Sequence, residues 1–445
     1  MILSCKTSPR QWSESEIILL YKKGDPNDIG NYRPISLLPT LYKLFSHIIE
    51  KKIKETTEKF QPIEQAGFRR GFSTIDHIHT LEMMVDKYQE FNRPLYAVFI
   101  DYQKAFDTLL HPTIWESLLS QGVALEYIQV LKNIYDNNTS RVKLETTGPL
   151  IEIKRGVRQG DPISPTIFIA VLESIFRNLS WKNVGINING SYLSHLRFAD
   201  DIVLLSENTN QLQMMINSLH DESRKVGLEI NLKKTNVMTN YTKVPIYLDN
   251  LPLTYVDTYI YLGKQISFSQ DNNLQEVERR VNITWKKFWS LKEILKSDMT
   301  IKLKSKVMNT CLLPSLTYAC QTWKFTRKVK NKIITCQRSM ERSILKIRKI
   351  EKVRHTDIRR KTKVIDALNY AQKLKWRWAG HVARLGDNRW TKEITSWRGP
   401  SGKRRQGRPN TRWADDIIKI AGDHWIQIAN DRKKWQSLEE AFTLH

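Results

Sequence analysis

The segment LRFADDIVLLS, residues 196–206, places two adjacent aspartates, Asp200 and Asp201, between two apolar runs. Both runs are rich in strand-forming residues, so the segment predicts two strands joined by a tight turn at the aspartate pair. A simple polar turn is one interpretation of the pair. Adjacent carboxylates repel each other, however, and the apolar setting favours a site that binds something of opposite charge.

A third carboxylate, Asp101, follows the apolar run that opens PLYAVFIDYQKAFD, residues 94–107. That run predicts a strand, and the Lys-Ala-Phe-Asp segment predicts a turn into a helix. Antiparallel packing can bring Asp101, Asp200 and Asp201 together at one sheet edge. Oxygen ligands without a nearby His or Cys select Mg²⁺ or Mn²⁺. The three residues therefore predict a metal-dependent phosphoryl-transfer site.

The remaining pattern divides the chain into a mixed first half and a helical second half. Before residue 270 the predicted helices are 40–59, 112–135 with a break near Gly122, 164–179 with Ser164 as N-cap and Pro165 at its first position, and 208–226 ended by Gly227. Short strands fill residues 228–266. Later helices are predicted at 272–296, 300–324 and 326–350. In the first helix, one side is expected to carry Leu41, Leu44, Phe45, Ile48, Ile49 and Ile53.

The net charge of +25 lies wholly in the second part of the chain. Residues 1–260 carry 29 Lys/Arg and 29 Asp/Glu, whereas residues 261–445 carry 42 and 17, together with 10 of the 13 Trp. Basic residues interleaved with aromatic ones favour nucleic acid as the partner. The alternative is a solvated charged face above a Trp-containing core.

A basic loop at 398–412 is expected to be flexible and to bind nucleic acid. Its basic side chains are expected to contact phosphates: Lys403, Arg404, Arg405, Arg408 and Arg412. The rings of the flanking Trp397 and Trp413 are expected to stack on unpaired bases. A nuclear-import signal is the alternative interpretation of the loop.

The sequence shows no apolar run of membrane-spanning length and no signal peptide, so no membrane partner is expected. Cys5, Cys311, Cys320 and Cys336 form no CxxC pair and indicate reduced thiols in an intracellular, nuclear or cytoplasmic protein. A zinc site from Cys311, Cys320 and His381 is disfavoured, because the spacing of these residues is poor.

Seven motifs resemble, in order, those of reverse transcriptases of non-long-terminal-repeat (LINE-type) retrotransposons. They are KKGDPNDIGNYRPISLLPTLYKLF (22–45), QAGFRRGFST (65–74), FIDYQKAFD (99–107), GVRQGDPISP (156–165), LRFADD (196–201), GLEINLKKT (227–235) and YLG (261–263). WAGHVARLGDNRW and GRPNTRWADDI are similar to the tail of the RTE-like branch of endonuclease–reverse transcriptases. The resemblance implies an α+β right-hand polymerase fold, with fingers and palm at 1–265, a helical thumb at 266–350 and a basic nucleic-acid-binding region at 351–445.

The resemblance also implies roles for individual residues. Asp101, Asp200 and Asp201 would hold Mg²⁺ or Mn²⁺, assisted by the backbone carbonyl of Tyr102. Phe106 would be the steric gate against a ribose 2′-hydroxyl. The nucleotide would lie beside Gln159 and Gly160, with its triphosphate at Arg33, Lys43 and Arg69; a structural salt bridge is the alternative for both arginines. Tyr261, Leu262 and Gly263 would form the primer grip.

The implied reaction is RNA-directed DNA synthesis, with an RNA template, a DNA primer and dNTPs. An inactive, retroelement-derived nucleic-acid-binding fragment is the alternative. An RNA-dependent RNA polymerase would share the paired aspartates, but Phe106 and the ordered motifs argue against it. Members of this family usually carry an upstream endonuclease domain, and this chain begins inside the finger region, so a truncated copy is expected.

Overall fold

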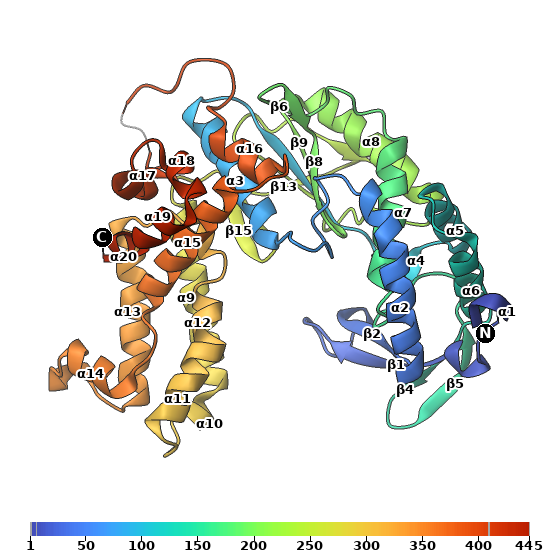
Figure 1. The fold of residues 1–445 in the computed structure, drawn as a ribbon, viewed down its shortest axis with the longest axis horizontal. Coiled ribbons are helices and arrows are strands. Elements are labelled where there is room, and N and C mark those ends of the chain that lie inside the picture. Colours follow the sequence, from blue (N-terminus) through green and yellow to red (C-terminus); the bar gives the residue numbers. More distant parts are fainter. Residues whose placement is uncertain (1, 6, 408–409, 445) are drawn as a thin grey trace.

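The computed structural model describes residues 2–5, 7–407 and 410–444. Two arms extend from a central five-stranded sheet (Figure 1). The N-terminal arm consists of the sheet β2-β1-β4-β5 and helix α2, and the helical arm consists of α9 to α14. The C-terminal helices α15 to α20 lie beside the central sheet, on the side of the helical arm (Figure 1).

The central sheet has the strand order β13-β10-β3-β9-β8. The bounds are β3 (Tyr96–Ile100), β8 (His195–Phe198), β9 (Asp201–Ser206), β10 (Asn236–Thr239) and β13 (Thr254–Tyr255). All pairs are antiparallel except β10 with β13. The period-2 alternation of β3 sends Val98 and Ile100 into one core and Ala97 and Phe99 into another, so the sheet is buried on both faces.

Two layers of helices cover these faces. The first core contains side chains of α5 (His111–Ser120), α6 (Leu125–Asp136), α7 (Ser164–Asn178) and α8 (Thr209–Lys225). The second contains α3 (Thr74–Glu90) and the C-terminal helices. The predicted break near Gly122 is confirmed, because Gly122 has φ +76° between α5 and α6. Ser164 is the first helical residue of α7 rather than its N-cap, which is Ile163.

The N-terminal arm combines β1 (Glu14–Tyr21), β2 (Tyr32–Leu37), β4 (Thr139–Lys143) and β5 (Thr147–Glu152) with α2 (Thr40–Thr57). Helix α2 packs on α7 through a face that includes Tyr42, Ile49 and Ile53. Leu41, Leu44 and Ile48 are exposed, which corrects the prediction of one apolar side. The helix has apolar residues on two faces, and only one of them meets α7.

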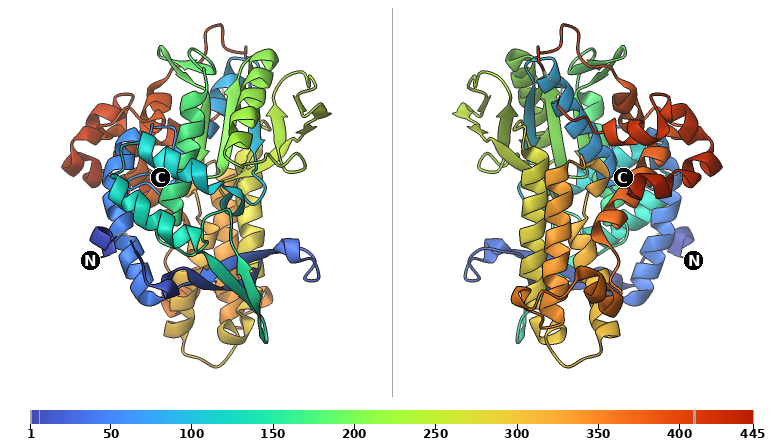
Figure 2. Two further views of the ribbon diagram at one scale, coloured as in Figure 1. Left: turned by 90° about the vertical axis from the view of Figure 1, so that its right-hand side faces the viewer. Right: turned by 90° about the vertical axis from the view of Figure 1, so that its left-hand side faces the viewer.

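The helical arm has its own core. It consists of α9 (Asn272–Ser290), α10 (Lys292–Leu295), α11 (Ile301–Val307), α12 (Leu313–Leu316), α13 (Arg327–Ile344) and α14 (His355–Thr362). Helices α9 and α13 run side by side below the central sheet (Figure 2). The single helix predicted at 300–324 is instead interrupted by a π-helical turn at Met308–Leu312 and by Ala319, which has φ +57°.

The C-terminal helices share the second core of the central sheet. Their bounds are α15 (Ala367–Ala383), α16 (Trp390–Ser396), α17 (Asp415–Ala421), α18 (Trp425–Asn430), α19 (Arg432–Ser437) and α20 (Glu439–Leu444). Six tryptophans of these helices and of the segment that joins α16 to α17 are buried in that core: Trp376, Trp390, Trp397, Trp413, Trp425 and Trp435. Trp376 stacks on Trp435 with ring centroids 3.9 Å apart. Residues 367–444 therefore pack on the central sheet instead of standing apart from it.

Short elements complete the chain: α1 (Ile2–Cys5), α4 (Ala105–Thr108), β6 (Ile186–Ile188), β7 (Ser191–Leu193), β11 (Tyr247–Leu248), β12 (Leu251–Pro252), β14 (Thr258–Tyr261) and β15 (Lys264–Ser267). In the part of the chain that the structure describes, no helix has the length and apolarity needed to cross a bilayer.

Candidate active site

The three predicted aspartates lie at one end of the central sheet. Ile100, the last residue of β3, pairs with Ile202 of β9. One step beyond this pair, β3 continues to Asp101 and β9 begins at Asp201. Asp200 occupies the turn between β8 and β9, where Phe198 pairs with Asp201. The antiparallel register therefore places all three carboxylates at the same sheet edge, as the sequence predicts.

The charges of these carboxylates act on one another. The pKa of Asp201 is raised to about 6, first by desolvation and then by the negative charges of Asp200 and Asp101. The pKa of Asp200 is also raised, chiefly by desolvation and further by Asp101. Both side chains keep an exposed surface, so water screens part of this repulsion. A cation would relieve the repulsion.

The aspartate turn is held by the segment 64–67. Ala199, which precedes the aspartates, has φ +57°, and its N–H donates to Oε1 of Gln65 over 3.1 Å. The same oxygen accepts from the N–H of Gly67 at 2.8 Å. A Cβ on Gly67 would lie 2.4 Å from the backbone nitrogen of Ala199, so only glycine permits this approach. Gln65 is fully buried and is a supporting residue that the sequence did not single out.

The backbone around Asp101 is fixed from the opposite side. The N–H of Asn231 donates to the carbonyl of Asp101 at 2.7 Å, and the N–H of Gln103 donates to Glu229 at 2.9 Å. This pattern makes Tyr102 and Ile230 a non-hydrogen-bonded antiparallel pair. In such a pair each residue's own C=O points away from its partner. The Tyr102 carbonyl therefore faces the β9 side, where Asp201 lies.

A divalent cation fits the chemistry of this donor set. The Oδ2 atom of Asp101 is buried without a hydrogen-bond partner, and its nearest cation is Nζ of Lys234 at 3.7 Å. Carboxylate and carbonyl oxygens are the ligands that Mg²⁺ prefers. Within the described residues, no three His, Cys, Asp or Glu side chains converge as a ready-made ligand cluster. The aspartates are thus neighbours whose side chains do not meet at one point.

Cationic side chains surround the aspartates. Positive charge on Arg33 and Lys22 opposes part of the rise that desolvation causes in the pKa of Asp200. The pKa of Lys22 is itself lowered, first by desolvation and then by Arg33 and Lys234. Lys22 and Lys234 lie within the motifs KKGD and NLKKT, where no sequence signal distinguishes either from the lysine beside it. Lys43 lies on α2 and is half-buried.

Arg69 has a structural role here, which corrects its prediction as a triphosphate ligand. Its Nε bonds Glu58 at 2.7 Å, and its Nη1 donates to the carbonyls of Pro62 and Gln65. The guanidinium also lies 4.4 Å from the ring centroid of Phe72. The side chain is only 11% exposed, so few of its donors can reach a phosphate. The alternative of a structural salt bridge is the one that the structure supports.

Phe106 and Gln159 are each positioned by a partner. The Phe106 ring stacks on Phe168, with centroids 4.7 Å apart and planes 12° apart. Nε2 of Gln159 donates to Oδ1 of Asp107 at 3.0 Å, and its carbonyl accepts from the N–H of Ser36 at 2.7 Å. Gly160 has φ +109°, and a Cβ there would lie 2.9 Å from the Ser36 carbonyl oxygen. The 159–160 segment therefore rests on β2, the strand that carries Arg33.

The predicted primer grip is the tip of the β14–β15 hairpin. Leu262 and Gly263 both have positive φ, as a tight hairpin turn requires. The hydroxyl of Tyr318 donates to the Leu262 carbonyl at 2.7 Å, and Nη2 of Arg279 donates to the Gly263 carbonyl at 2.6 Å. Tyr259 in the same hairpin stacks on Phe99 of β3 at 4.0 Å. The hairpin thus links the helical arm to β3, the strand that directly precedes Asp101.

Comparison with known proteins identifies this arrangement. Residues 21–266 match the family described as "Reverse transcriptase (RNA-dependent DNA polymerase)". The chain belongs to the reverse transcriptase family. The central sheet, the N-terminal arm and the helical arm are accordingly the palm, fingers and thumb of a right-hand polymerase fold of the α+β class. The predicted relation to non-long-terminal-repeat retrotransposons is confirmed by the relatives.

The chain is 36% identical to a transposon-derived protein of Caenorhabditis elegans over 267 residues, which are 56% of this chain and 95% of that protein. It is 27% identical to the RNA-directed DNA polymerase from mobile element jockey of Drosophila funebris, over 76% of this chain and 38% of that protein. The chain thus spans less than half the length of jockey. A solved telomerase of Candida tropicalis, in complex with a fragment of telomeric RNA, matches with a TM-score of 0.43 and 13% identity, covering 88% of this chain and 65% of that chain.

The basic loop of this reverse transcriptase packs against the end of α3. Arg404 and Arg412 both pair with Glu90, with Nε of Arg404 at 3.1 Å and Nη2 of Arg412 at 2.5 Å. Trp397 and Trp413 are buried, 5% and 2% exposed, so neither ring can stack on a base. This corrects their predicted role. Lys403 and Arg405 are exposed, and Arg408 lies outside the described residues.

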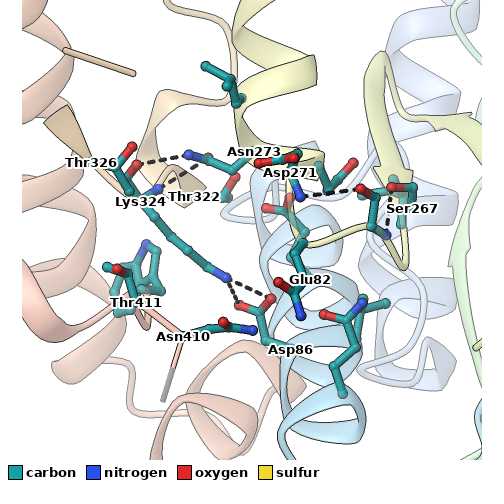
Figure 3. Close-up of a pocket in the computed structure, with 18 of the residues that line it drawn as sticks. Glu82, Asp86, Ser267, Asp271, Asn273, Thr322, Lys324, Thr326, Asn410 and Thr411 are labelled. Carbon is teal, nitrogen blue, oxygen red and sulfur yellow. Dashed lines mark hydrogen bonds and ion pairs between the residues drawn. The ribbon is translucent and has the colours of Figure 1, made fainter. Parts of the chain in front are cut away.

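A hollow of about 760 Å³ lies where α3, the start of α9 and the segment 322–328 meet (Figure 3). Asp101, Asp200 and Asp201 do not line it. Lys324 pairs with Asp86 at 2.7 Å, and its backbone N–H and carbonyl bond the side chain of Asn273 (Figure 3). Lys264 likewise pairs with Glu82. The charged side chains here join the thumb to the palm.

Proposed function

We propose that this chain catalyses RNA-templated DNA synthesis, adding a deoxynucleotide to the 3′-hydroxyl of a DNA primer. The observation that carries the proposal is that Asp101, Asp200 and Asp201 lie together at one sheet edge, where desolvation and the negative charge of Asp101 raise the pKa of both Asp200 and Asp201. Family membership supports the reaction class. The whole reaction also needs an RNA template, a DNA primer and dNTPs as partners.

The aspartates would hold divalent metal ions, Mg²⁺ or Mn²⁺, together with the Tyr102 carbonyl. The Oδ2 atom of Asp101, which is buried without a hydrogen bond, supports this assignment. Bound ions in such a site activate the primer hydroxyl and stabilise negative charge on the leaving pyrophosphate. The chain's own contribution is to hold the carboxylates in place, through the Gln65 contact with Ala199 and the Asn231 contact with Asp101.

Cationic groups opposite the aspartates would bind the triphosphate. Arg33 of β2 and Lys22 act electrostatically on Asp200, so both lie within reach of phosphates held at the aspartates. A guanidinium fork and an ammonium point charge both suit phosphate oxygens. Lys43 on α2 is the third candidate. Lys234, beside Asp101, would stabilise charge on the same phosphates.

Nucleotide choice and primer placement would fall to residues on both sides of the aspartates. The Phe106 ring, fixed by Phe168, would exclude a ribose 2′-hydroxyl by occupying its volume. The Gln159 and Gly160 backbone would flank the base pair being formed. The hairpin tip of Tyr261, Leu262 and Gly263 would support the primer end. The exposed basic loop residues Lys403 and Arg405 would contact phosphates of the nucleic acid.

The test is primer extension on an RNA template with purified Asp200→Asn protein. This variant should lose extension, because a carboxylate needed for metal is gone, while template binding persists. Asp221→Asn removes an equal charge from an exposed position on α8 and should extend normally. Loss of template binding together with extension in Asp200→Asn would make the aspartate structural. Absence of extension by the wild type would refute the proposed activity.

A further inference from the structure

The far end of the helical arm contains a hollow lined only by lysines and small polar residues. Its volume is about 740 Å³, and its lining residues are Lys302, Ser305, Lys306, Asn309, Thr310, Lys361, Thr362 and Lys363. Four of these eight are lysines, and none is acidic. Helices α11 and α14, which form it, lie at the opposite end of the arm from the palm sheet (Figure 1). We call it the lysine hollow.

Two distant chain segments are pinned together to form the lysine hollow. Ser305 of α11 donates its hydroxyl to the carbonyl of Thr362, and both residues are buried. Oδ1 of Asn309 accepts from the N–H of Ile365 at 3.1 Å. Lys302 and Lys306 lie one helical turn apart, so their side chains share a face of α11. The hollow is therefore a fixed part of the fold.

The backbone at the hollow departs from regular helix at two points. A π-helical turn at Met308–Leu312 follows α11 directly and carries Asn309 and Thr310. Lys363 ends α14 with φ +52°, a conformation that costs a side-chain-bearing residue energy. Such irregularities are frequent at functional sites.

The four lysines are exposed and carry uncompensated charge. No carboxylate in the described ranges forms an ion pair with Lys302, Lys306, Lys361 or Lys363. The neighbouring acids are engaged elsewhere: Asp357 of α14 pairs with Arg360, and Asp366, the N-cap of α15, pairs with Arg359. Four ammonium groups around one hollow repel each other, and an anion that spans them removes this repulsion.

We propose that the lysine hollow binds the phosphate backbone of a nucleic acid strand, as a second contact outside the catalytic site. Lysines on two segments around an open hollow suit successive phosphates of a strand. Hydroxyl and amide groups of Thr310 and Asn309 add neutral polar atoms to the lining. No aromatic side chain lines the hollow, so it contacts the backbone and not the bases. This site deepens the proposed function, since it presumes that the chain handles nucleic acid.

The test compares two variants with equal loss of charge. The hollow variant carries Lys302→Gln, Lys306→Gln, Lys361→Gln and Lys363→Gln. The control variant carries Lys132→Gln, Lys154→Gln, Lys182→Gln and Lys243→Gln, all at exposed positions in the fingers and palm. Each protein is titrated with a fluorescent 30-nucleotide RNA, a DNA of the same sequence and their hybrid duplex, at several salt concentrations. Circular dichroism verifies that both variants are folded.

The hollow variant should bind all three probes more weakly, because a backbone contact does not depend on the sugar. The slope of log K against log salt should flatten by about 3 units for single strands and about 3.6 for duplex, if all four lysines contact phosphates. The control variant should keep most of the wild-type slope of log K against log salt. Equal slopes in wild type and hollow variant, or equal losses in both variants, would overturn the proposal.

Competition with inorganic phosphate distinguishes a strand from a small anion. A strand contact should persist in millimolar phosphate once ionic strength is matched with chloride. If phosphate instead displaces the probes from the wild type only as far as the hollow variant's affinity, the ligand is a free phosphate group and the strand proposal fails. These binding measurements need no catalysis, so they stand whether or not the chain extends a primer.

Discussion

Oε1 of Gln65 lies 3.1 Å from the backbone nitrogen of Ala199 and accepts its hydrogen bond, directly before the aspartate pair. Ala199 has φ +57°, a conformation that an alanine does not favour. The contact therefore holds the turn that presents Asp200 and Asp201. Gln65 acts through the turn and does not touch a reacting atom, so it is a positioning residue.

Replacing Gln65 by Met should show whether this side chain positions the aspartate turn for catalysis or only stabilises the fold. The change leaves the N–H groups of Ala199 and Gly67 without an acceptor, which costs about 1–3 kcal/mol of stability per group. We expect kcat for primer extension to fall about tenfold or more, the equivalent of about 1.4 kcal/mol, with KM for dNTP nearly unchanged. Steady-state kinetics on folded protein measures both constants.

Gln121→Met is the matched control for this prediction. Gln121 is also fully buried, and its Nε2 donates to the Ala170 carbonyl at 2.7 Å, between α5 and α7. Its loss should lower thermal stability comparably and leave kcat of the folded fraction unchanged. If both variants lose the same share of activity per folded molecule, Gln65 is merely structural.

The sequence predicted the parts of the site that lie within contiguous motifs. The strand that ends just before Asp101 and the strand that begins at Asp201 follow from their strand-forming apolar runs, and their antiparallel pairing gives the sheet edge. The burial of Trp397 and Trp413 was not predictable, because it depends on docking against α3, about 300 residues earlier in the chain. The same holds for Arg69, whose partner Glu58 is set by the loop after α2. The sequence shows that a residue is basic or aromatic, but its contact partners depend on the tertiary structure.

Divalent metal should stabilise the wild type through the aspartates. Ligand that binds only the folded state stabilises it by about 1.4 kcal/mol at ten times its Kd. We expect added Mg²⁺ to raise Tm and a chelator to reverse the effect. Asp201→Asn should show a much smaller rise, since one of the proposed ligands is lost. Thermal melts with and without Mg²⁺ test this.

Asp221→Asn provides the control for the metal effect, because it removes the same charge from the exposed surface of α8. Its Tm should respond to Mg²⁺ as the wild type does. An equal response in Asp201→Asn would place the stabilising ions elsewhere on the protein.

Phe106→Ala should weaken the discrimination against ribonucleotides. The ring stacks on Phe168, so its position is fixed, and truncation opens volume beside the expected sugar. We expect rNTP incorporation to rise relative to dNTP, measured as the ratio of the two kcat/KM values. Phe168→Leu keeps the Phe106 ring but loosens its support, and should give an intermediate ratio. Unchanged rNTP exclusion in Phe106→Ala would remove the steric-gate assignment.

Arg33→Ala and Arg69→Ala should have different effects, the first on nucleotide binding and the second on stability. Arg33 is exposed and acts electrostatically on Asp200, so its removal should raise KM for dNTP with little change in Tm. Arg69 bonds Glu58 and two backbone carbonyls, so its removal should lower Tm and leave KM nearly constant. A raised KM in Arg69→Ala at unchanged Tm would restore its predicted role as a phosphate ligand.

Tyr318→Phe should reduce processivity without slowing single additions. Its hydroxyl donates to the Leu262 carbonyl at 2.7 Å, at the tip of the hairpin expected to support the primer. The phenylalanine ring would keep the packing of the Arg280 guanidinium, which lies 4.4 Å from the ring centroid. The hydrogen bond to Leu262 is lost, together with a longer one to the Thr74 hydroxyl at 3.3 Å. The bond to Leu262 is worth about 0.5–1.5 kcal/mol, or roughly two- to tenfold in dissociation if the tip must be rigid to hold primer.

Primer extension in the presence of a nucleic-acid trap measures this effect. Product length after one binding event should shorten in Tyr318→Phe, while single-nucleotide addition on bound primer keeps its rate, because the aspartates are untouched. Tyr255→Phe is the matched control: its hydroxyl donates to the Val244 carbonyl at 2.6 Å, away from the hairpin tip. Equally shortened products in both variants would show that the effect does not depend on the contact with the hairpin tip. Unchanged length in Tyr318→Phe would mean that the two arginines of α9, Arg279 and Arg280, hold the tip without it.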